Sequence, residues 1–202
     1  MKQAMPTGAE LKALLLRAPR RTLAVAESMT CGHLQARIGA VSGASEFFLG
    51  GITAYTLDEK VRHLGVKRAA AEPVNSVSAA VAEQMARGAC VLFDSDFALA
   101  TTGYAEPFDL AQNRPFDGEP SRTAQGRPSA EWNVPAPFAW WALAHAQGPR
   151  KTRSKRGGIF FVRSGRIDGP GRARVAMQEF VAERALTELV GYLRAWRAGS
   201  AA

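Results

Sequence analysis

Ser28 is the first residue whose type and position could support chemistry. It follows a short apolar run at 22–26, which predicts a buried strand, and it precedes a segment of helical period that ends near Ile38. The first N–H groups of a helix have no partner inside the helix and carry the positive end of its dipole, so they can bind an oxyanion or a phosphate. Ser28 is therefore a candidate nucleophile. The alternative is that Ser28 or Thr30 only caps the helix.

The amine of Lys60 is the candidate base. A neutral lysine amine can accept the proton of a serine hydroxyl when burial and nearby positive charge lower its pKa from about 10.4 toward 7 to 8. Lys60 lies five residues after Tyr55 and 32 residues after Ser28, in a segment that we expect to be helical over 57–64. The alternative is that Lys60 is a surface residue of that helix, because two acidic residues precede it.

The histidines and cysteines do not form a recognisable catalytic or metal-binding set. His33, His63 and His145 are widely separated, and no pair of them has the spacing of metal ligands. The two cysteines, Cys31 and Cys90, are too few for a disulfide framework or a zinc site. We therefore expect no metal and no cofactor. Cys31 leaves one alternative open, because a thiol near a helix N-terminus can have a lowered pKa and act as a nucleophile.

The elements that must position these groups alternate between strand and helix. We expect helices at 7–17, 33–38, 57–64, 76–90 with Ser76 as N-cap, and 172–196, and strands at 22–26, 52–55, 97–101, 138–146 and 158–163. A short helix-like piece at 46–49, bounded by Gly50 and Gly51, precedes the second strand. This order predicts an α/β fold, a three-layer α/β/α sandwich with a mixed central sheet, and ligands in such folds bind at the carboxyl ends of strands.

Residues from about 108 to 137 interrupt this pattern. They are rich in Pro, Gly, Asn, Arg and acidic residues and have no apolar period. A loop of about 30 residues inside a compact domain is unusual. We interpret it as an irregular insertion, either a lid or a surface decoration, in a single domain that spans 1–202.

Charge and hydropathy restrict the possible partners. The chain has a formal net charge of +8, and its basic residues cluster at 149–156 and 163–174. No aromatic residues that could stack on bases are interleaved within either cluster. We therefore interpret 149–156 as a solvated hairpin and expect no nucleic-acid partner, although an anion- or nucleic-acid-binding role of this run stays open. No stretch approaches the roughly 20 apolar residues of a membrane span, and the first 21 residues lack the pattern of a signal peptide. We expect a cytoplasmic protein without a membrane contact.

Three motifs resemble the CinA carboxyl-terminal domain family. AESMTCG at 26–32, SGAS at 42–45 with the following Gly-Gly pair, and YTLDEK at 55–60 are similar to the family's AESCTGG, GSS with a Gly-rich turn, and YSNEAK. The resemblance implies a hydrolase of the NAD salvage pathway, or pyridine nucleotide cycle: an amidase that deamidates nicotinamide mononucleotide, or a related nicotinamide compound, to the acid and ammonia. It implies Ser28 as nucleophile, Lys60 as general base and then acid, and Tyr55 as a hydrogen-bond partner of one of them or of the substrate.

The resemblance also implies a substrate-binding set. Thr102 and Gly103 begin TGYAEP, which is similar to the family's TGIAGP, and they would bind substrate or the oxyanion. Arg172 would pair with a phosphate through its planar fork, and Arg174 is the alternative because one extra residue makes the alignment ambiguous. The set is completed by Glu27, Thr30 and Gly32. The implied partner is a phosphorylated nicotinamide compound, and the implied assembly is a homodimer or a higher homo-oligomer.

Several residues depart from the family pattern in ways that bear on the substrate. Leu57 replaces an asparagine, Glu106 replaces a glycine, Ala176 replaces an arginine and Cys31 replaces the first glycine of the turn. Glu106 puts a negative charge where a phosphorylated ligand would be expected. The natural substrate therefore stays open, and so does the alternative of a catalytically silent, CinA-like protein that binds a nucleotide or a partner.

Overall fold

The computed structural model describes residues 8–107, 134, 136–147 and 158–199. Almost all of the predicted insertion at 108–137, and the basic run at 149–156, lie outside these residues. The helices are α1 (Gly8–Leu16), α2 (His33–Gly39), α3 (Leu57–Leu64), α4 (Arg68–Ala71), α5 (Ala79–Phe93) and α7 (Arg174–Arg197), with short 3-10 helices at Ala44–Glu46 and Glu72–Val74. The strands are β1 (Leu23–Glu27), β2 (Phe48–Thr53), β3 (Phe97–Tyr104), β4 (Phe138–Ala146) and β5 (Phe160–Asp168).

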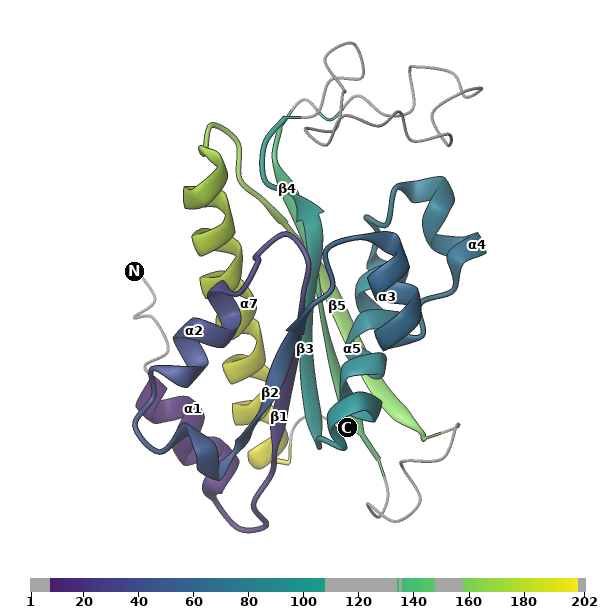
Figure 1. Cartoon of the computed structure of the whole chain (residues 1–202). Coiled ribbons are helices and arrows are strands. Elements are labelled where there is room, and N and C mark those ends of the chain that lie inside the picture. The colour runs from purple at the N-terminus through teal and green to yellow at the C-terminus, as the bar shows by residue number, and fades with distance from the viewer. Residues whose placement is uncertain (1–7, 108–133, 135, 148–157, 200–202) are drawn as a thin grey trace.

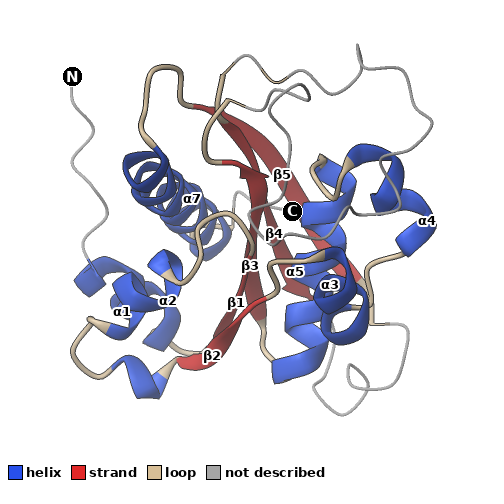
Figure 2. Ribbon diagram, turned by 45° about the horizontal axis from the view of Figure 1, so that its top comes forward, coloured by secondary structure: helices blue, strands red, loops and turns tan. Residues whose placement is uncertain are grey.

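The five strands form one mixed sheet in the order β2-β1-β3-β4-β5 (Figure 2). β1 runs parallel to β2 and β3, whereas β4 runs antiparallel to β3 and β5. Glu27 at the end of β1 pairs with Thr53 of β2 and Thr101 of β3. The carboxyl ends of these three strands therefore meet at one edge of the sheet, which is the upper edge in Figure 1.

Helices cover both faces of the sheet. Figure 1 shows α1, α2 and α7 on one side and α3, α4 and α5 on the other. This arrangement confirms the predicted three-layer α/β/α sandwich with a mixed sheet in a single domain. Among the described residues, no helix is long and apolar enough to cross a membrane.

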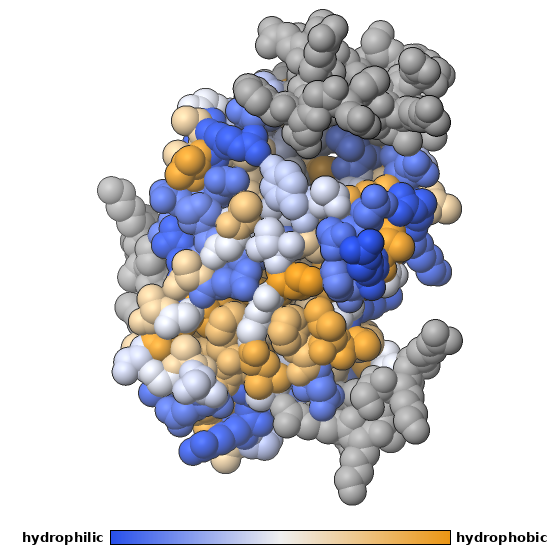
Figure 3. All heavy atoms as spheres, in the orientation of Figure 1, coloured by the Kyte–Doolittle hydropathy of each residue, from blue (hydrophilic) through white to orange (hydrophobic). Residues whose placement is uncertain are grey.

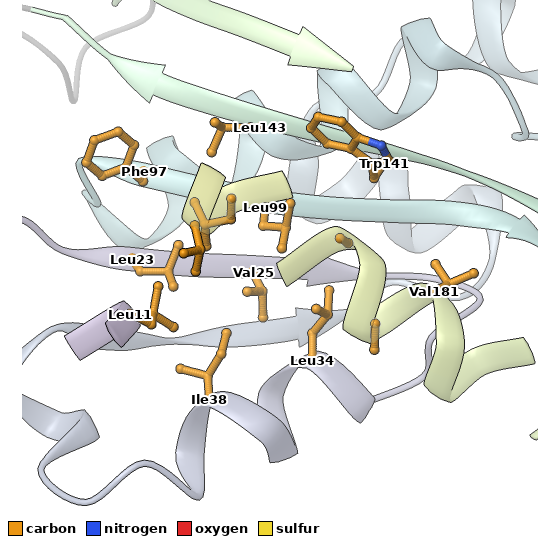
Figure 4. Close-up of a cluster of buried hydrophobic side chains, with 14 of the residues drawn as sticks. Leu11, Leu23, Val25, Leu34, Ile38, Phe97, Leu99, Trp141, Leu143 and Val181 are labelled. Carbon is orange, nitrogen blue, oxygen red and sulfur yellow. The ribbon is translucent and has the colours of Figure 1, made fainter. Parts of the chain in front are cut away.

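The two faces of the sheet carry side chains of different size. Large side chains face α1, α2 and α7, where Leu23, Val25, Leu99 and Leu143 pack against helix residues such as Leu34 (Figure 4). Alternate positions on the same strands hold small residues that face α5, and these are Ala26, Ala98, Ala100, Ala142 and Ala144. Because successive side chains of a strand point to opposite faces, this alternation lets α5 lie close to the sheet, and α3 packs on α5 in turn.

The second strand begins earlier in the sequence than predicted. β2 begins at Phe48 rather than at 52, and the 3-10 helix lies before it, so the helix-like piece expected at 46–49 was wrong in its bounds. The prediction treated Gly50 and Gly51 as a break, but both lie inside β2. At Gly51 a Cβ atom would lie 2.4 Å from Cγ2 of Val25. The glycine thus allows close packing within a strand and does not end it.

The predicted N-cap of α5 was also wrong. The cap is Ser78, whose hydroxyl oxygen accepts a hydrogen bond from the Val81 N–H at 3.2 Å. Ser76 has a positive φ of 61° and precedes the helix by three residues. Both serines stand before the same apolar period, so composition did not distinguish them.

Candidate active site

Ser28 lies at the carboxyl edge of the sheet, in the turn between β1 and α2. Its N–H donates to the carbonyl oxygen of Thr101 at 3.0 Å, and the N–H of Ala54 donates to the carbonyl of Glu27 at 2.9 Å. Ser28 therefore sits between the ends of β2 and β3. The residue is 6% exposed, and within the described part of the chain its hydroxyl has no hydrogen-bond partner. The hydroxyl is thus available for chemistry.

Glu27 holds the turn that carries Ser28. Its buried carboxylate accepts hydrogen bonds through Oε2 from the Thr30 hydroxyl at 2.7 Å and from the N–H groups of Gly32 and Leu34 at 2.9 and 3.0 Å. Oε1 accepts from the N–H of Gln35 at 2.9 Å. These are N–H groups that the first turn of a helix leaves without partners, and a negative charge is favourable there. Glu27 therefore caps α2.

This cap changes the expected role of the helix N-terminus. We predicted free N–H donors for an oxyanion or a phosphate, but the Glu27 carboxylate already occupies those of Gly32, Leu34 and Gln35. Glu27 and Thr30 have no exposed surface, so the structure gives them a supporting position behind the turn. Among the described residues, the backbone N–H groups of Met29 and Thr30 have no acceptor, and they directly follow Ser28.

Thr30 and Gly32 complete the turn. The Thr30 hydroxyl lies 2.7 Å from that of Thr101, which ties the turn to β3. Gly32 has a φ of 99°, a conformation that residues with a Cβ rarely adopt. Gly32 therefore allows the chain to enter α2 at the angle that brings its N–H groups to Glu27.

Lys60 is buried on α3 and points to the same edge of the sheet. The residue is 2% exposed, and its amine donates to the carbonyl oxygen of Tyr55 at 3.0 Å. Burial lowers the pKa of Lys60 from 10.5 to about 8. The alternative of a solvent-exposed Lys60 was therefore wrong. Since Tyr55 follows the end of β2 by two residues, the amine is held beside the end of β2, the strand that pairs with β1.

Two packing features place Lys60. The hydroxyl of Thr56 caps α3 by accepting a hydrogen bond from the Glu59 N–H, which starts the helix directly after the β2 loop. On the far side, Gly88 of α5 lies so close to α3 that a Cβ atom would stand 2.1 Å from the carbonyl oxygen of Leu64. α3 therefore packs tightly on α5 and carries Lys60 inward.

Tyr55 contributes its two polar groups in different directions. Its carbonyl binds Lys60, whereas its phenol accepts a hydrogen bond from Nη2 of Arg174 at 2.7 Å, and the residue as a whole is 49% exposed. Nη1 of Arg174 donates to Oε1 of Glu106 at 2.5 Å. The phenol thus binds neither Ser28 nor Lys60 in this structure. A contact between the phenol and substrate stays a prediction.

The two arginines expected near a phosphate have different environments. The guanidinium of Arg172 lies over the ring of Phe180, 3.7 Å from its centroid. Arg174, the first residue of α7, is the one that contacts Tyr55 and Glu106. Of the two candidate arginines, the structure therefore places the alternative, Arg174, beside Tyr55. It also shows that the carboxylate of Glu106 faces Arg174. The Glu106–Arg174 pair was missed from the sequence, because 68 residues separate the two.

Thr102 and Gly103 lie in the last part of β3, next to Ser28. The Thr102 hydroxyl donates to the carbonyl oxygen of Ser76 at 2.8 Å and is buried. A Cβ atom at Gly103 would lie 2.4 Å from the carbonyl oxygen of Phe138 on β4. Thr102 and Gly103 therefore hold the end of β3 against Ser76 and against β4. The Thr102 hydroxyl would have to break its hydrogen bond to Ser76 before it could bind a ligand.

In the part of the chain that the structure describes, the other ionisable side chains offer no second centre of this kind. Within the described residues, no three His, Cys, Asp or Glu side chains are grouped so that they could hold a metal ion. His63 pairs with Glu59, and His145 lies at the opposite edge of the sheet, where it binds the Tyr192 hydroxyl. Figure 3 shows hydrophilic residues toward the edge with the candidate site and an apolar band lower down, across β2 and α5.

The fold and site define a class of protein: a three-layer α/β/α domain with a serine hydroxyl and a buried lysine amine at the carboxyl edge of three parallel strands. Comparison with known proteins shows the family. The model of the CinA C-terminal domain matches residues 7–116, and the chain belongs to this family. The matched region includes Ser28, Tyr55, Lys60 and Glu106 but not Arg174.

Related sequences and structures agree with this assignment. A CinA-like protein of Picosynechococcus is 52% identical over 93 residues, and a putative competence-damage inducible protein of Streptococcus thermophilus is 42% identical over 93 residues. Each match covers 46% of this chain and 22% of the relative, so it spans about a fifth of the length of these proteins. The crystal structure of a CinA superfamily protein from Klebsiella pneumoniae has a TM-score of 0.67 at 23% identity and covers 94% of this chain and 96% of its own. One from Escherichia coli has a TM-score of 0.63 at 25% identity and covers 91% and 86%.

Proposed function

We propose that this protein is an amidohydrolase that deamidates nicotinamide mononucleotide or a related nicotinamide compound to the acid and ammonia. The observation that carries this proposal is Lys60, a buried amine whose pKa is lowered to about 8 at the sheet edge that also holds Ser28. An amine of this kind is neutral in part of the population near pH 7, which a proton acceptor requires. The choice of a carboxamide as the substrate rests on the resemblance of the motifs around Ser28 and Lys60 to those of the CinA family.

The proposed reaction has two steps. The amine of Lys60 leaves the Tyr55 carbonyl and accepts the proton of Ser28 while Oγ bonds to the carboxamide carbon. The C–N bond then breaks, and the Lys60 ammonium gives its proton to the departing nitrogen, which leaves as ammonia. Water, deprotonated by Lys60, hydrolyses the resulting ester and frees Ser28. The N–H groups of Met29 and Thr30 are the proposed donors to the oxyanion.

Ammonia release from nicotinamide mononucleotide tests the proposal. The purified protein is compared with Ser28→Ala and Lys60→Met, and Lys67→Met on the exposed surface serves as the control. Ammonia and the acid product are measured together. We expect a loss of at least about 100-fold in kcat for the first two variants, the usual contribution of a general base, and wild-type turnover for the control. Equal turnover in all four proteins would contradict the proposed roles.

A catalytically silent binding protein is the second candidate. It is favoured by one observation: the amine of Lys60 donates to Tyr55, and the described residues show no hydrogen bond between it and Ser28. This candidate predicts that nicotinamide mononucleotide binds with the same affinity to the wild type and to Ser28→Ala and that neither releases ammonia. Calorimetry and the ammonia assay on the same samples separate the two candidates.

The assembly and the location of the protein are proposals that rest on the resemblance and the sequence. We retain a homodimer or a higher homo-oligomer, which sedimentation velocity measures directly, and a cytoplasmic protein with no nucleic-acid or membrane partner. A salt-dependent association with DNA would contradict the last point, because binding through phosphate contacts weakens as salt rises.

A further inference from the structure

One guanidinium joins three segments at the carboxyl edge of the sheet. Arg174 begins α7, Tyr55 lies between β2 and α3, and Glu106 follows β3 by two residues. Arg174 donates from Nη2 to the Tyr55 hydroxyl at 2.7 Å and from Nη1 to the Glu106 carboxylate at 2.5 Å. Since the carbonyl of Tyr55 also holds Lys60, this contact lies next to the proposed reaction centre.

The donors of Arg174 are those that a phosphate would use. Arginine recognises phosphate through pairs of N–H groups of its planar fork. Here a carboxylate takes one terminal nitrogen and a phenol takes the other. A phosphate at this arginine would have to displace Glu106 and would lie beside a second negative charge, which is unfavourable.

Two other cationic side chains near this edge, Lys60 and Arg172, do not take the place of Arg174 as a partner for a phosphate. The amine of Lys60 is buried and bound to the Tyr55 carbonyl. The guanidinium of Arg172 stacks on Phe180. Within the described residues, Arg174 is therefore the arginine in contact with the candidate site, and Glu106 neutralises it.

The pair can be changed without harm to the fold. The side chains of Arg174 and Glu106 are 46% and 57% exposed, and exposed ion pairs contribute little to stability. Loss of the carboxylate would leave Arg174 bound to Tyr55 with a free terminal nitrogen. Glu106 thus acts on the charge of the site and not on the folding of the chain.

We propose that Glu106 is a specificity-determining residue: by occupying Arg174 it makes the site select nicotinamide compounds without a phosphate, such as the nucleoside, over the phosphorylated nucleotide. The proposal rests on the proposed function for the chemical class of ligand.

The test compares two ligands that differ by one phosphate, nicotinamide riboside and nicotinamide mononucleotide. Binding is measured by calorimetry in a Ser28→Ala background, so that no turnover interferes. Addition of Glu106→Gln is expected to lower the Kd for the mononucleotide by roughly two- to fivefold, the range that a half-exposed charge pair supports, and to leave the Kd for the riboside nearly unchanged. Addition of Arg174→Gln to Glu106→Gln is expected to remove the gain, and Glu179→Gln on the exposed face of α7 serves as the control.

Three results would overturn the inference: an unchanged ratio of the two Kd values in Glu106→Gln, a gain that persists without Arg174, and no binding of either ligand. Ammonia release is measured separately with Ser28 intact, where Glu106→Gln should lower KM for the mononucleotide with little change in kcat. A shift in binding without ammonia would defeat the proposed function and leave the role of Glu106. Ammonia without a shift would defeat only the role of Glu106.

Discussion

Burial of a lysine is unfavourable as long as its amine is charged, and Lys60 is 2% exposed. The structure offers this amine the carbonyl of Tyr55 and, within the described residues, no carboxylate. The result is a pKa lowered to about 8 by desolvation. This single property connects the packing of α3 with the chemistry that we propose, and it can be tested through both activity and stability.

The first prediction concerns pH and activity. A base must be neutral to accept a proton, so kcat/KM for nicotinamide amide hydrolysis should rise about tenfold per pH unit below pH 8 and level off above it. Initial rates between pH 6 and about 10 in buffers of constant ionic strength measure this profile. An inflection near 10.5, the value of a solvated lysine, would show that Lys60 is not the titrating base.

The second prediction concerns stability. The pKa of Lys60 is about 8 in the folded chain and 10.5 in the unfolded chain. Below pH 8 both states bind the proton, and burial of the charged amine destabilises the folded state by about 3 kcal/mol, since one pKa unit corresponds to about 1.4 kcal/mol. Between pH 8 and 10.5 the unfolded chain binds more protons, so this cost disappears as pH rises.

Replacement of the amine removes that cost. Lys60→Met should therefore raise the Tm at pH 7 by roughly 5 °C or more, although it abolishes the proposed activity. The difference from the wild type should shrink as the pH approaches 10. Thermal denaturation followed by circular dichroism at both pH values measures it, with Lys67→Met as a matched control. A lower Tm at pH 7 would mean that the hydrogen bond to Tyr55 outweighs desolvation.

At the scale of elements, the contact between α3 and α5 decides where Lys60 points. Gly88→Ala should destabilise the protein by about 1–3 kcal/mol, because its Cβ atom would meet the backbone of Leu64 at 2.1 Å. The displaced α3 should also reduce activity. Gly191→Ala on α7 is the control: nothing lies within 4 Å of its Cβ position, so it should stabilise by about 0.5–1 kcal/mol.

Urea denaturation of the two glycine variants gives both values. The comparison separates close packing from helix propensity, because alanine is the better helix former at both positions. If Gly88→Ala proved as stable as Gly191→Ala, the tight approach of α3 to α5 would not exist in solution.

Elements with strong local signals could be predicted from the sequence. β4 has the predicted bounds 138–146, and α3 has the predicted bounds 57–64, because an unbroken apolar run and a helical period with a threonine before it are local features. β2 could not be placed, since glycines that permit packing on Val25 look the same as glycines that end a strand. α4 gave no signal, because four residues contain too little of any period.

The candidate site could be predicted in part. Ser28 and Lys60 lie at the same sheet edge, as the resemblance of their motifs to the family implied. The burial of Lys60 also had a signal, since it shares the helical spacing 57, 60, 64 with two leucines on one face of α3. The capping role of Glu27 and the contact of Arg174 with Tyr55 had no signal in the sequence. The contact joins residues that are 119 positions apart.

At the scale of the molecule, the two ends of the described chain support each other. α7 packs on α1, and the guanidinium of Arg197 donates to four carbonyl oxygens at and after the end of α1. These belong to Leu14, Arg17, Ala18 and Pro19, at 2.8 to 3.3 Å. Carbonyls at a helix C-terminus have no partner inside the helix, so the side chain of Arg197, in the last turn of α7, caps the C-terminus of α1.

The last prediction follows from this contact. Arg197→Gln should lower the free energy of unfolding by about 1–2 kcal/mol, since it removes several hydrogen bonds from a charged donor. Arg194→Gln, which removes only the surface ion pair with Glu10, should have a smaller effect. Urea denaturation of both variants measures the difference. Equal effects would show that α1 does not depend on the cap from α7.

Glu106 and Arg174, the pair that we propose sets the choice of ligand, lie on opposite sides of the boundary of the matched region 7–116. Ser28, Tyr55 and Lys60 are encoded in one segment, whereas the arginine that meets Tyr55 is encoded 119 codons later. If Glu106 and Arg174 set the choice of ligand as we propose, mutations at either position alter that choice and leave the proposed hydrolytic groups intact. A lineage of such proteins could therefore exchange substrates while it inherits one unchanged chemistry.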